Sequence, residues 1–223
     1  MLATIARTAR IGALLSLPML VLSGCTKNHG ELVVDDTVGV TALRSPCPLV
    51  EIPEMTGDVT LLAPGRTDAG AIDVVAAITN LRSSCDAAMH LPQLTTTIDF
   101  DVVARRSDTH GARHVELPYF TAIQRGGAST VAKHVSTIAI DFADGQDRVT
   151  VHGKTGTTIA RSEATLPLEM RNRLMRKRQA GDADAAVDPL SQPDVKAALA
   201  KATFEALVGF QLTDKQFAYN ATR

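Results

Sequence analysis

The chain has 223 residues, with 23 lysines and arginines against 24 aspartates and glutamates, and a formal net charge of −1. This balance lacks the basic excess with which proteins neutralise nucleic-acid phosphates, so it argues against a nucleic-acid partner. The length suffices for one hydrophobic core with an appendage.

The first 24 residues have the pattern of a secretory signal peptide. Arg7 and Arg10 give a positively charged start, and residues 11–22 are almost entirely apolar. This apolar run is shorter than the roughly 20 residues that a membrane-spanning helix needs. It ends in the letters LSGC, with Cys25 last. That ending resembles the lipobox of bacterial lipoproteins; the alternative is a simple signal peptide that ends near a cysteine.

The resemblance implies that the thiol of Cys25 is diacylated, that the chain is cut before Cys25, and that the new amine is acylated. Three acyl chains, at about 0.8 kcal/mol per buried methylene, form an anchor that does not come off. Thr26, rather than an aspartate, follows the cysteine. We therefore expect a periplasmic protein anchored by lipid, and the residue after the cysteine favours the outer membrane.

Two further cysteines, Cys47 and Cys85, remain for the body of the protein. An even number of cysteines in an oxidising compartment predicts a disulfide, and a loop of this length would stabilise the fold by about 4 kcal/mol. Two free buried thiols or half of a metal site are the alternatives. No CxxC pair accompanies them.

Residues 25–45 are polar and predict a tether, and residues 46–166 follow as a series of short strands separated by turns. Alternation is clearest in residues 94–105, where five apolar side chains share one face: Leu94, Ile98, Phe100, Val102 and Ala104. The strands are expected within 47–52, 58–62, 72–81, 94–106, 114–124, 129–142 and 148–156. This spacing predicts a mainly β fold, an immunoglobulin-like antiparallel β-sandwich of about seven strands.

The character of the sequence changes at Pro167, and we expect residues 167–223 to form a helical C-terminal segment. One helix is predicted to begin near Pro167, and a second to run from Ser191 to Gly209 with an apolar face. A last short helix is expected to be capped by Thr213.

Five basic residues lie close together in the first of these helices: Arg171, Arg173, Arg176, Lys177 and Arg178. On a helix they point in most directions, which is typical of a solvated helix with cations near its C-terminus. The functional alternative is contact with anionic lipid headgroups or an acidic envelope partner. This is the only feature of the sequence that implies a protein partner.

We find no catalytic motif and no metal or cofactor motif. Gly153-Lys154-Thr155 matches the end of a phosphate-binding loop, but Arg148 stands where the motif needs glycine, so no nucleotide is expected. Asp99 and Asp101 share a strand face that we expect to be open to solvent, and His110 and His114 have metal-binding spacing only on a helix.

The chain after Cys25 also resembles an uncharacterised family of bacterial envelope lipoproteins. The resemblance lies in CPLVEIP, AAITNLRSSC, LPYFTAI and FEALVGFQLTDKQFAYN, and it implies a fold and a compartment but no activity. We therefore expect a non-enzymatic lipoprotein with a structural, scaffolding or assembly role in the envelope. A binding module for a lipid, glycan or cell-wall fragment is the alternative, and an envelope hydrolase a weaker one.

Overall fold

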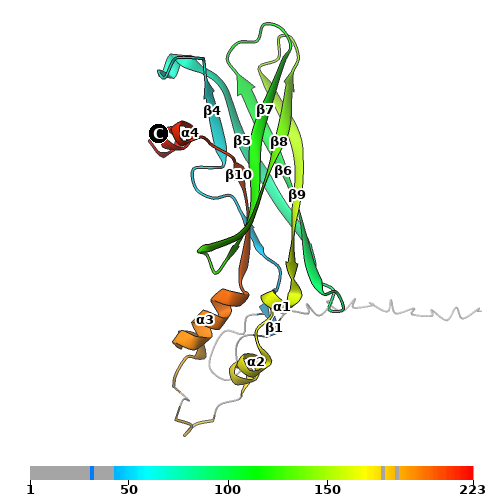
Figure 1. The fold of residues 1–223 in the computed structure, drawn as a ribbon, viewed down its shortest axis with the longest axis vertical. Coiled ribbons are helices and arrows are strands. Elements are labelled where there is room, and N and C mark those ends of the chain that lie inside the picture. Colours follow the sequence, from blue (N-terminus) through cyan, green and yellow to red (C-terminus); the bar gives the residue numbers. More distant parts are fainter. Residues whose placement is uncertain (1–30, 33–42, 177–178, 184–185, 223) are drawn as a thin grey trace, which may run out of the picture.

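Two four-stranded β-sheets face each other and enclose the main hydrophobic core (Figure 1). The computed structural model describes residues 31–32, 43–176, 179–183 and 186–222. One sheet has the order β3 (Leu49–Glu51), β10 (Phe204–Phe210), β7 (Arg113–Arg125) and β8 (Ser129–Phe142). The other has the order β4 (Asp58–Leu62), β5 (Ile72–Asp86), β6 (Gln93–Arg106) and β9 (Arg148–Ala160). A short ribbon of β1 (Glu31–Leu32) and β2 (Leu43–Arg44) precedes them. The predicted mainly β sandwich is confirmed.

The inward-facing side chains follow the alternation seen in the sequence. All five apolar residues predicted to share one face of β6 are less than 1% exposed, and they point into the core between the sheets. The ring of Phe100 on β6 meets that of Tyr119 on β7, with centroids 5.4 Å apart and an interplanar angle of 67°. Such edge-to-face contacts are favoured by the ring quadrupoles, so this pair joins the two sheets at the centre of the core.

The predicted helix from Ser191 to Gly209 is wrong in its second half. Helix α3 (Pro193–Ala202) ends at Ala202, and β10 follows directly as an interior strand between β3 and β7. Seven residues of β10 pair with β7, and all of β10 except Glu205 is buried. Pairing and burial between two distant segments override the helix propensity of the letters EAL. The C-terminal segment is therefore not wholly helical, and it supplies the eighth strand of the sandwich.

The sandwich is also not purely antiparallel, because β3 and β10 run parallel. After β3 the chain leaves this sheet and crosses to the other one to form β4. Backbone hydrogen bonds hold the crossing segment to both sheets. The backbone N–H of Phe210 donates to the carbonyl of Thr56 at 2.7 Å, and that of Ile78 donates to the carbonyl of Gly57 at 2.8 Å. One edge of the sandwich is thus closed by a segment that is bonded to both sheets.

Three helices and the loop 87–92 form one end of the molecule, called here the helical end (Figure 1). It comprises α1 (Arg161–Ala164), α2 (Leu168–Met175) and α3. These helices have a small core of their own, formed by Leu166, Leu174, Val195 and Ala202. The helix predicted to begin near Pro167 is confirmed, with Pro167 as its N-cap.

The last helix, α4 (Asp214–Ala221), lies apart from the helical end, beside β4 (Figure 1). Its predicted cap is confirmed: the backbone N–H of Gln216 donates to the hydroxyl of Thr213, and the Gln216 side chain accepts from the backbone N–H of Thr213. This reciprocal capping box satisfies donors that have no partner within the helix, and so fixes where α4 begins.

At the opposite end of the sandwich, called here the distal end, a buried arginine holds two loops together. The guanidinium of Arg106, which is 2% exposed, donates to four backbone carbonyls at 2.7–2.9 Å. These carbonyls belong to Thr109 and Gly111 in one loop, and to Ala143 and Gln146 in the other. Because every contact is a charge-assisted hydrogen bond, the cation is accommodated without a carboxylate.

Candidate functional site

A groove of about 970 Å³ lies between β4 and α4, near the distal end. This volume is at the upper end of the 300–1,000 Å³ that is typical of small-molecule sites. One wall is formed by β4 and the loop after it, and the other by α4. Its apolar lining residues are Leu61, Leu62, Ala63, Pro64, Ala218 and Tyr219. A neighbouring cavity, lined by residues that include Leu117 and Phe210, is much smaller, at about 50 Å³.

Helix α4 is held against the sandwich by Asn220, which is 5% exposed. Its side-chain amide donates to the carbonyl of Met55 at 2.9 Å and to that of Asp58 at 2.8 Å. Asp58 begins β4, so these two bonds tie the C-terminal turn of the helix to the start of the strand. The groove is therefore bounded by two fixed elements.

Charged residues line the groove at the β5–β7 side. Arg113 donates both of its terminal nitrogens to the carboxylate of Asp73, each at 2.5 Å. The hydrogen bonds from Arg113, helped by its positive charge, lower the pKa of Asp73. The same hydrogen bonds, helped by the negative charge of Asp73, raise the pKa of Arg113. At the rim, Arg66 binds the carboxylate of Asp68 and lowers its pKa in the same way.

A second region of interest is the helical end, where the segment before the sandwich enters. Arg44 donates to the carbonyls of Ala164 and Ala202, which end α1 and α3. A cation suits this position because the last carbonyls of a helix are unpaired and carry partial negative charge. One side chain thus holds the entering strand β2 against two helices.

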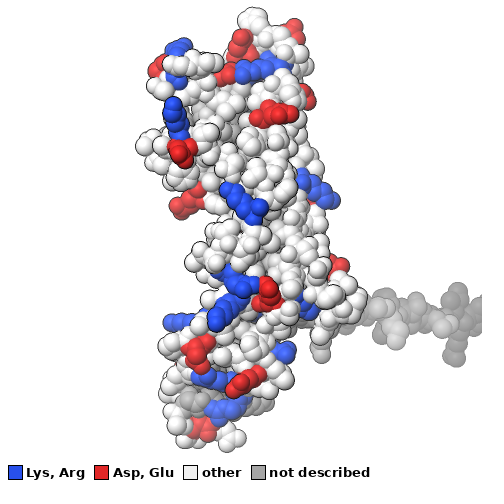
Figure 2. Space-filling view, in the orientation of Figure 1, with Lys and Arg blue, Asp and Glu red and all other residues white. Residues whose placement is uncertain are grey.

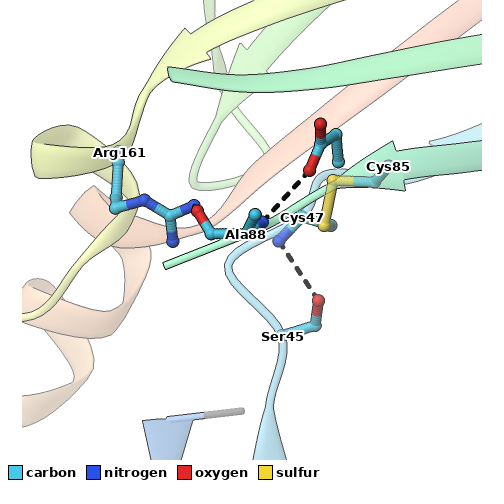
Figure 3. Close-up of a disulfide and its surroundings, with 6 residues drawn as sticks. Ser45, Cys47, Cys85, Ala88 and Arg161 are labelled. Carbon is cyan, nitrogen blue, oxygen red and sulfur yellow. Dashed lines mark hydrogen bonds between the residues drawn. A yellow bond between two sulfur atoms is a disulfide. The ribbon is translucent and has the colours of Figure 1, made fainter. Parts of the chain in front are cut away.

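The predicted disulfide between Cys47 and Cys85 is confirmed, with an S–S distance of 2.05 Å (Figure 3). It joins the entering segment to the end of β5. Near the disulfide, Arg161 of α1 donates to the carbonyl of Ala88 (Figure 3) and to that of Leu91, both at 2.6 Å, and so holds the loop after β5. The disulfide and the bonds of Arg44 fasten residues 44–47 to the body.

The basic residues predicted to contact an anionic partner are engaged within the chain where the structure describes them. Arg173 binds Asp194 and Gln192, and Arg176 binds Asp182. Arg171 is half-buried in α2. Lys177 and Arg178 lie outside the described residues, as does Cys25. On the face shown in Figure 2, the helical end carries intermingled positive and negative side chains.

The carboxylates Asp99 and Asp101 lie on the outer face of their sheet, as predicted, and His152 joins them from β9. Its Nδ1 lies 3.1 Å from Asp101 and its Nε2 lies 3.3 Å from Asp99. Asn80, in the left-handed region with φ 53°, donates to Asp101 at 2.6 Å. Hydrogen bonding by Asn80, followed by His152, lowers the pKa of Asp101. Among the described residues, no three His, Cys, Asp or Glu side chains are arranged to hold a metal ion.

Sequence reasoning did not find the groove. Its walls come from segments 60–67, 73, 113 and 213–222, which lie far apart along the chain. From the sequence, residues 63–71 were expected only to form a turn between strands. The last helix was expected only to be capped by Thr213. No local pattern indicates that Asp73 and Arg113 pair, because that contact depends on how β5 and β7 lie across the sandwich.

No helix within the described ranges is both long and apolar enough to cross a membrane. No protein-family model, curated protein or solved structure matches this chain.

Proposed function

We propose that the chain is a lipoprotein of the bacterial envelope, anchored in the outer membrane through Cys25, with its body in the periplasm. It acts there without catalysis, in scaffolding or assembly of an envelope complex. The observation that carries this proposal is the fastening of the entering segment at Arg44 and Cys47. A body held by a lipid at Cys25 experiences any pull through these residues.

The fastening suits a tethered protein because it distributes such a pull over several elements. The disulfide passes it to β5, and Arg44 passes it to α1 and α3. The small core of the helical end supports the latter contact. A segment joined to the body by a single strand pair would come away more easily, because a two-residue ribbon has marginal stability.

Metabolic labelling with an alkyne analogue of palmitate tests the anchor. The wild-type chain is expected to take up the label, and Cys25→Ala to take up none. The matched control is the double variant Cys47→Ala/Cys85→Ala, which removes two cysteines but keeps Cys25 and should be labelled normally. Labelling of Cys25→Ala, or none of the wild type, would contradict the anchor.

In-cell crosslinking with capture through a C-terminal tag tests the assembly role. One stoichiometric envelope protein should be recovered, and recovery should persist in detergent-washed membranes. If no protein is recovered in stoichiometric amount, the scaffolding role is wrong.

The second candidate function is a binding module for a small envelope ligand. The groove between β4 and α4 favours it, because its volume and its apolar lining are those of an organic-ligand site. It lies near the distal end, away from the helical end where the tether enters (Figure 1). The two functions are compatible, since the ligand site and the entering segment occupy different parts of the molecule.

A further inference from the structure

We infer that the groove between β4 and α4 binds an anionic amphiphile: one alkyl chain along the apolar wall and one negative head group at Lys215. This inference rests on the binding-module candidate above and not on the lipid anchor. Two independent features of the groove carry it, namely a run of four apolar residues at the end of β4 and an uncompensated charge on α4.

The apolar wall lies at the end of β4, opposite a β-bulge in β5. Leu61 pairs with Val74 and Leu62 with Ile72, so Asp73 is the extra residue of the bulge. Leu61 and Leu62 both line the groove, together with Ala63 and Pro64 after them. Four successive apolar residues make a continuous surface that suits an alkyl chain better than a glycan, which needs several polar partners.

Four charged residues line the groove, and three of them already have ion-pair partners. Arg113 is paired with Asp73, and Arg66 with Asp68. Lys215 forms no ion pair with any residue in the described ranges. The groove and its rim therefore have one positive charge left to be matched, which suits a ligand with a single negative charge.

The position of Lys215 is not explained by the stability of α4. It lies in the first turn, where the helix dipole favours anions and disfavours cations. Replacing it by glutamate should leave α4 as stable as before or slightly more stable. Lys215→Glu is for this reason a clean test of the charge, because a loss of binding cannot be attributed to loss of the helix.

The test uses the chain from Cys25 onward with Cys25→Ser, which contains every element that the structure describes. Isothermal titration calorimetry below the critical micelle concentration compares decanoate, dodecanoate and decyltrimethylammonium, with a soluble muropeptide as the glycan probe. Each methylene that enters the groove should strengthen binding up to about fourfold. The cationic amphiphile should bind more weakly than decanoate, although their alkyl chains are alike.

Two variants and two matched controls locate the site. Lys215→Glu should weaken dodecanoate binding about fivefold or more, as for loss of one exposed ion pair. Ala218→Trp should abolish it, because the exposed Ala218 side chain points into the groove. The controls are Lys196→Glu, at an exposed position near the start of α3, and Phe217→Trp, which is 48% exposed on α4 but does not line the groove. Both control variants should bind dodecanoate as tightly as the parent. All four variants should have the melting temperature of the parent.

The remaining outcomes overturn the inference. If decanoate and decyltrimethylammonium bind equally, the charge of the head group does not contribute to binding. If decanoate and dodecanoate bind equally, the alkyl chain does not lie in the groove. Unchanged binding in both groove variants places the ligand elsewhere. Binding of the muropeptide alone would preserve the binding module and reject the amphiphile, and no binding of any probe would reject both.

Discussion

Thr96 and Thr157 are paired across strands β6 and β9, and both side-chain hydroxyls are buried without a hydrogen-bond partner among the described residues. They face inward between two core clusters, one around Phe100 and the other around Leu94 and Ile159. A buried hydroxyl without a partner costs free energy, whereas an isosteric apolar group does not.

Thr96→Val and Thr157→Val should therefore raise the free energy of unfolding, each by up to about 1 kcal/mol, in urea denaturation. The control is Thr121→Val. Its hydroxyl lies 2.8 Å from that of Thr155, so its removal should lower stability by about 1 kcal/mol. A loss in Thr96→Val as large as that in Thr121→Val would show that the Thr96 hydroxyl has a partner after all.

Gly153 on β9 is required by the ring of Phe100. A Cβ atom at position 153 would lie 2.4 Å from two atoms of that ring, which is too close for any side chain. Gly153→Ala should lower stability by about 1–3 kcal/mol, as other overpacked cores do. In the double variant with Phe100→Leu the smaller side chain makes room, so the combined loss should be less than the sum of the two single losses. Simple additivity would mean that the contact is not responsible.

The four carbonyls bound by Arg106 depend on its cation. Arg106→Met should lower the free energy of unfolding by about 3 kcal/mol or more, because several buried acceptors lose their donors at once. The stability of Arg106→Lys should lie between those of the parent and Arg106→Met, since the lysine ammonium offers three hydrogen-bond donors. Arg105→Met, at the exposed neighbouring position, should change stability by less than about 0.5 kcal/mol. Similar losses in the Arg105 and Arg106 methionine variants would contradict the role given to Arg106.

The sequence predicted those parts of the fold that are governed by local pattern. Strands such as β6 were recognised because one face is buried and the period of two is visible, as from Leu94 to Ala104. If the alternation from Leu94 to Ala104 is extended by two residues, it places Arg106 on the inward face. The buried cation could therefore have been predicted from the sequence. Thr213 was recognised as a cap because capping involves only four neighbouring residues.

What could not be predicted depends on contacts between distant segments. Residues 204–210 continue the apolar pattern of the preceding helix, and only their place between β3 and β7 makes them a strand. The groove likewise exists because α4 packs beside β4, through bonds from Asn220 to residues more than 160 positions earlier. Neither relationship leaves a trace in the spacing of nearby residues.

The disulfide closes a separation of 38 residues, between Cys47 and Cys85. In the chain-entropy description its removal should cost about 4 kcal/mol, because the unfolded chain gains freedom. Cys47→Ser/Cys85→Ser should accordingly unfold at a lower urea concentration than the parent. Reductant should lower the midpoint of the parent and leave that of the double variant unchanged. A parent that is insensitive to reductant and equal to the variant would exclude a stabilising role.

The pair formed by Asp73 and Arg113 should make stability depend on pH in the acid range. The pKa of Asp73 is lowered in the folded protein, chiefly by the hydrogen bonds from Arg113. A lowered carboxyl pKa contributes stability that is fully present above the unfolded value of about 3.9 and is lost as the pH falls through the folded value. Asp73→Asn should thus unfold more easily than the parent at pH 6, by at most about 1 kcal/mol, and the difference should shrink as the pH falls through the folded value.

The pair of His114 and Asp141 provides a control of opposite sign. The pKa of His114 is raised, mainly by the hydrogen bond that its ring donates to the carboxylate of Asp141. Its contribution is therefore present below the unfolded value of about 6.5 and is lost as the pH rises through the folded value. Melting temperatures of the parent, Asp73→Asn and Asp141→Asn between pH 2 and pH 8 distinguish the two. For Asp73→Asn the difference from the parent should grow with pH through the acid range, and for Asp141→Asn it should shrink above neutrality. If the Asp73→Asn curve ran parallel to that of the parent throughout, the paired carboxylate would not be the group that titrates.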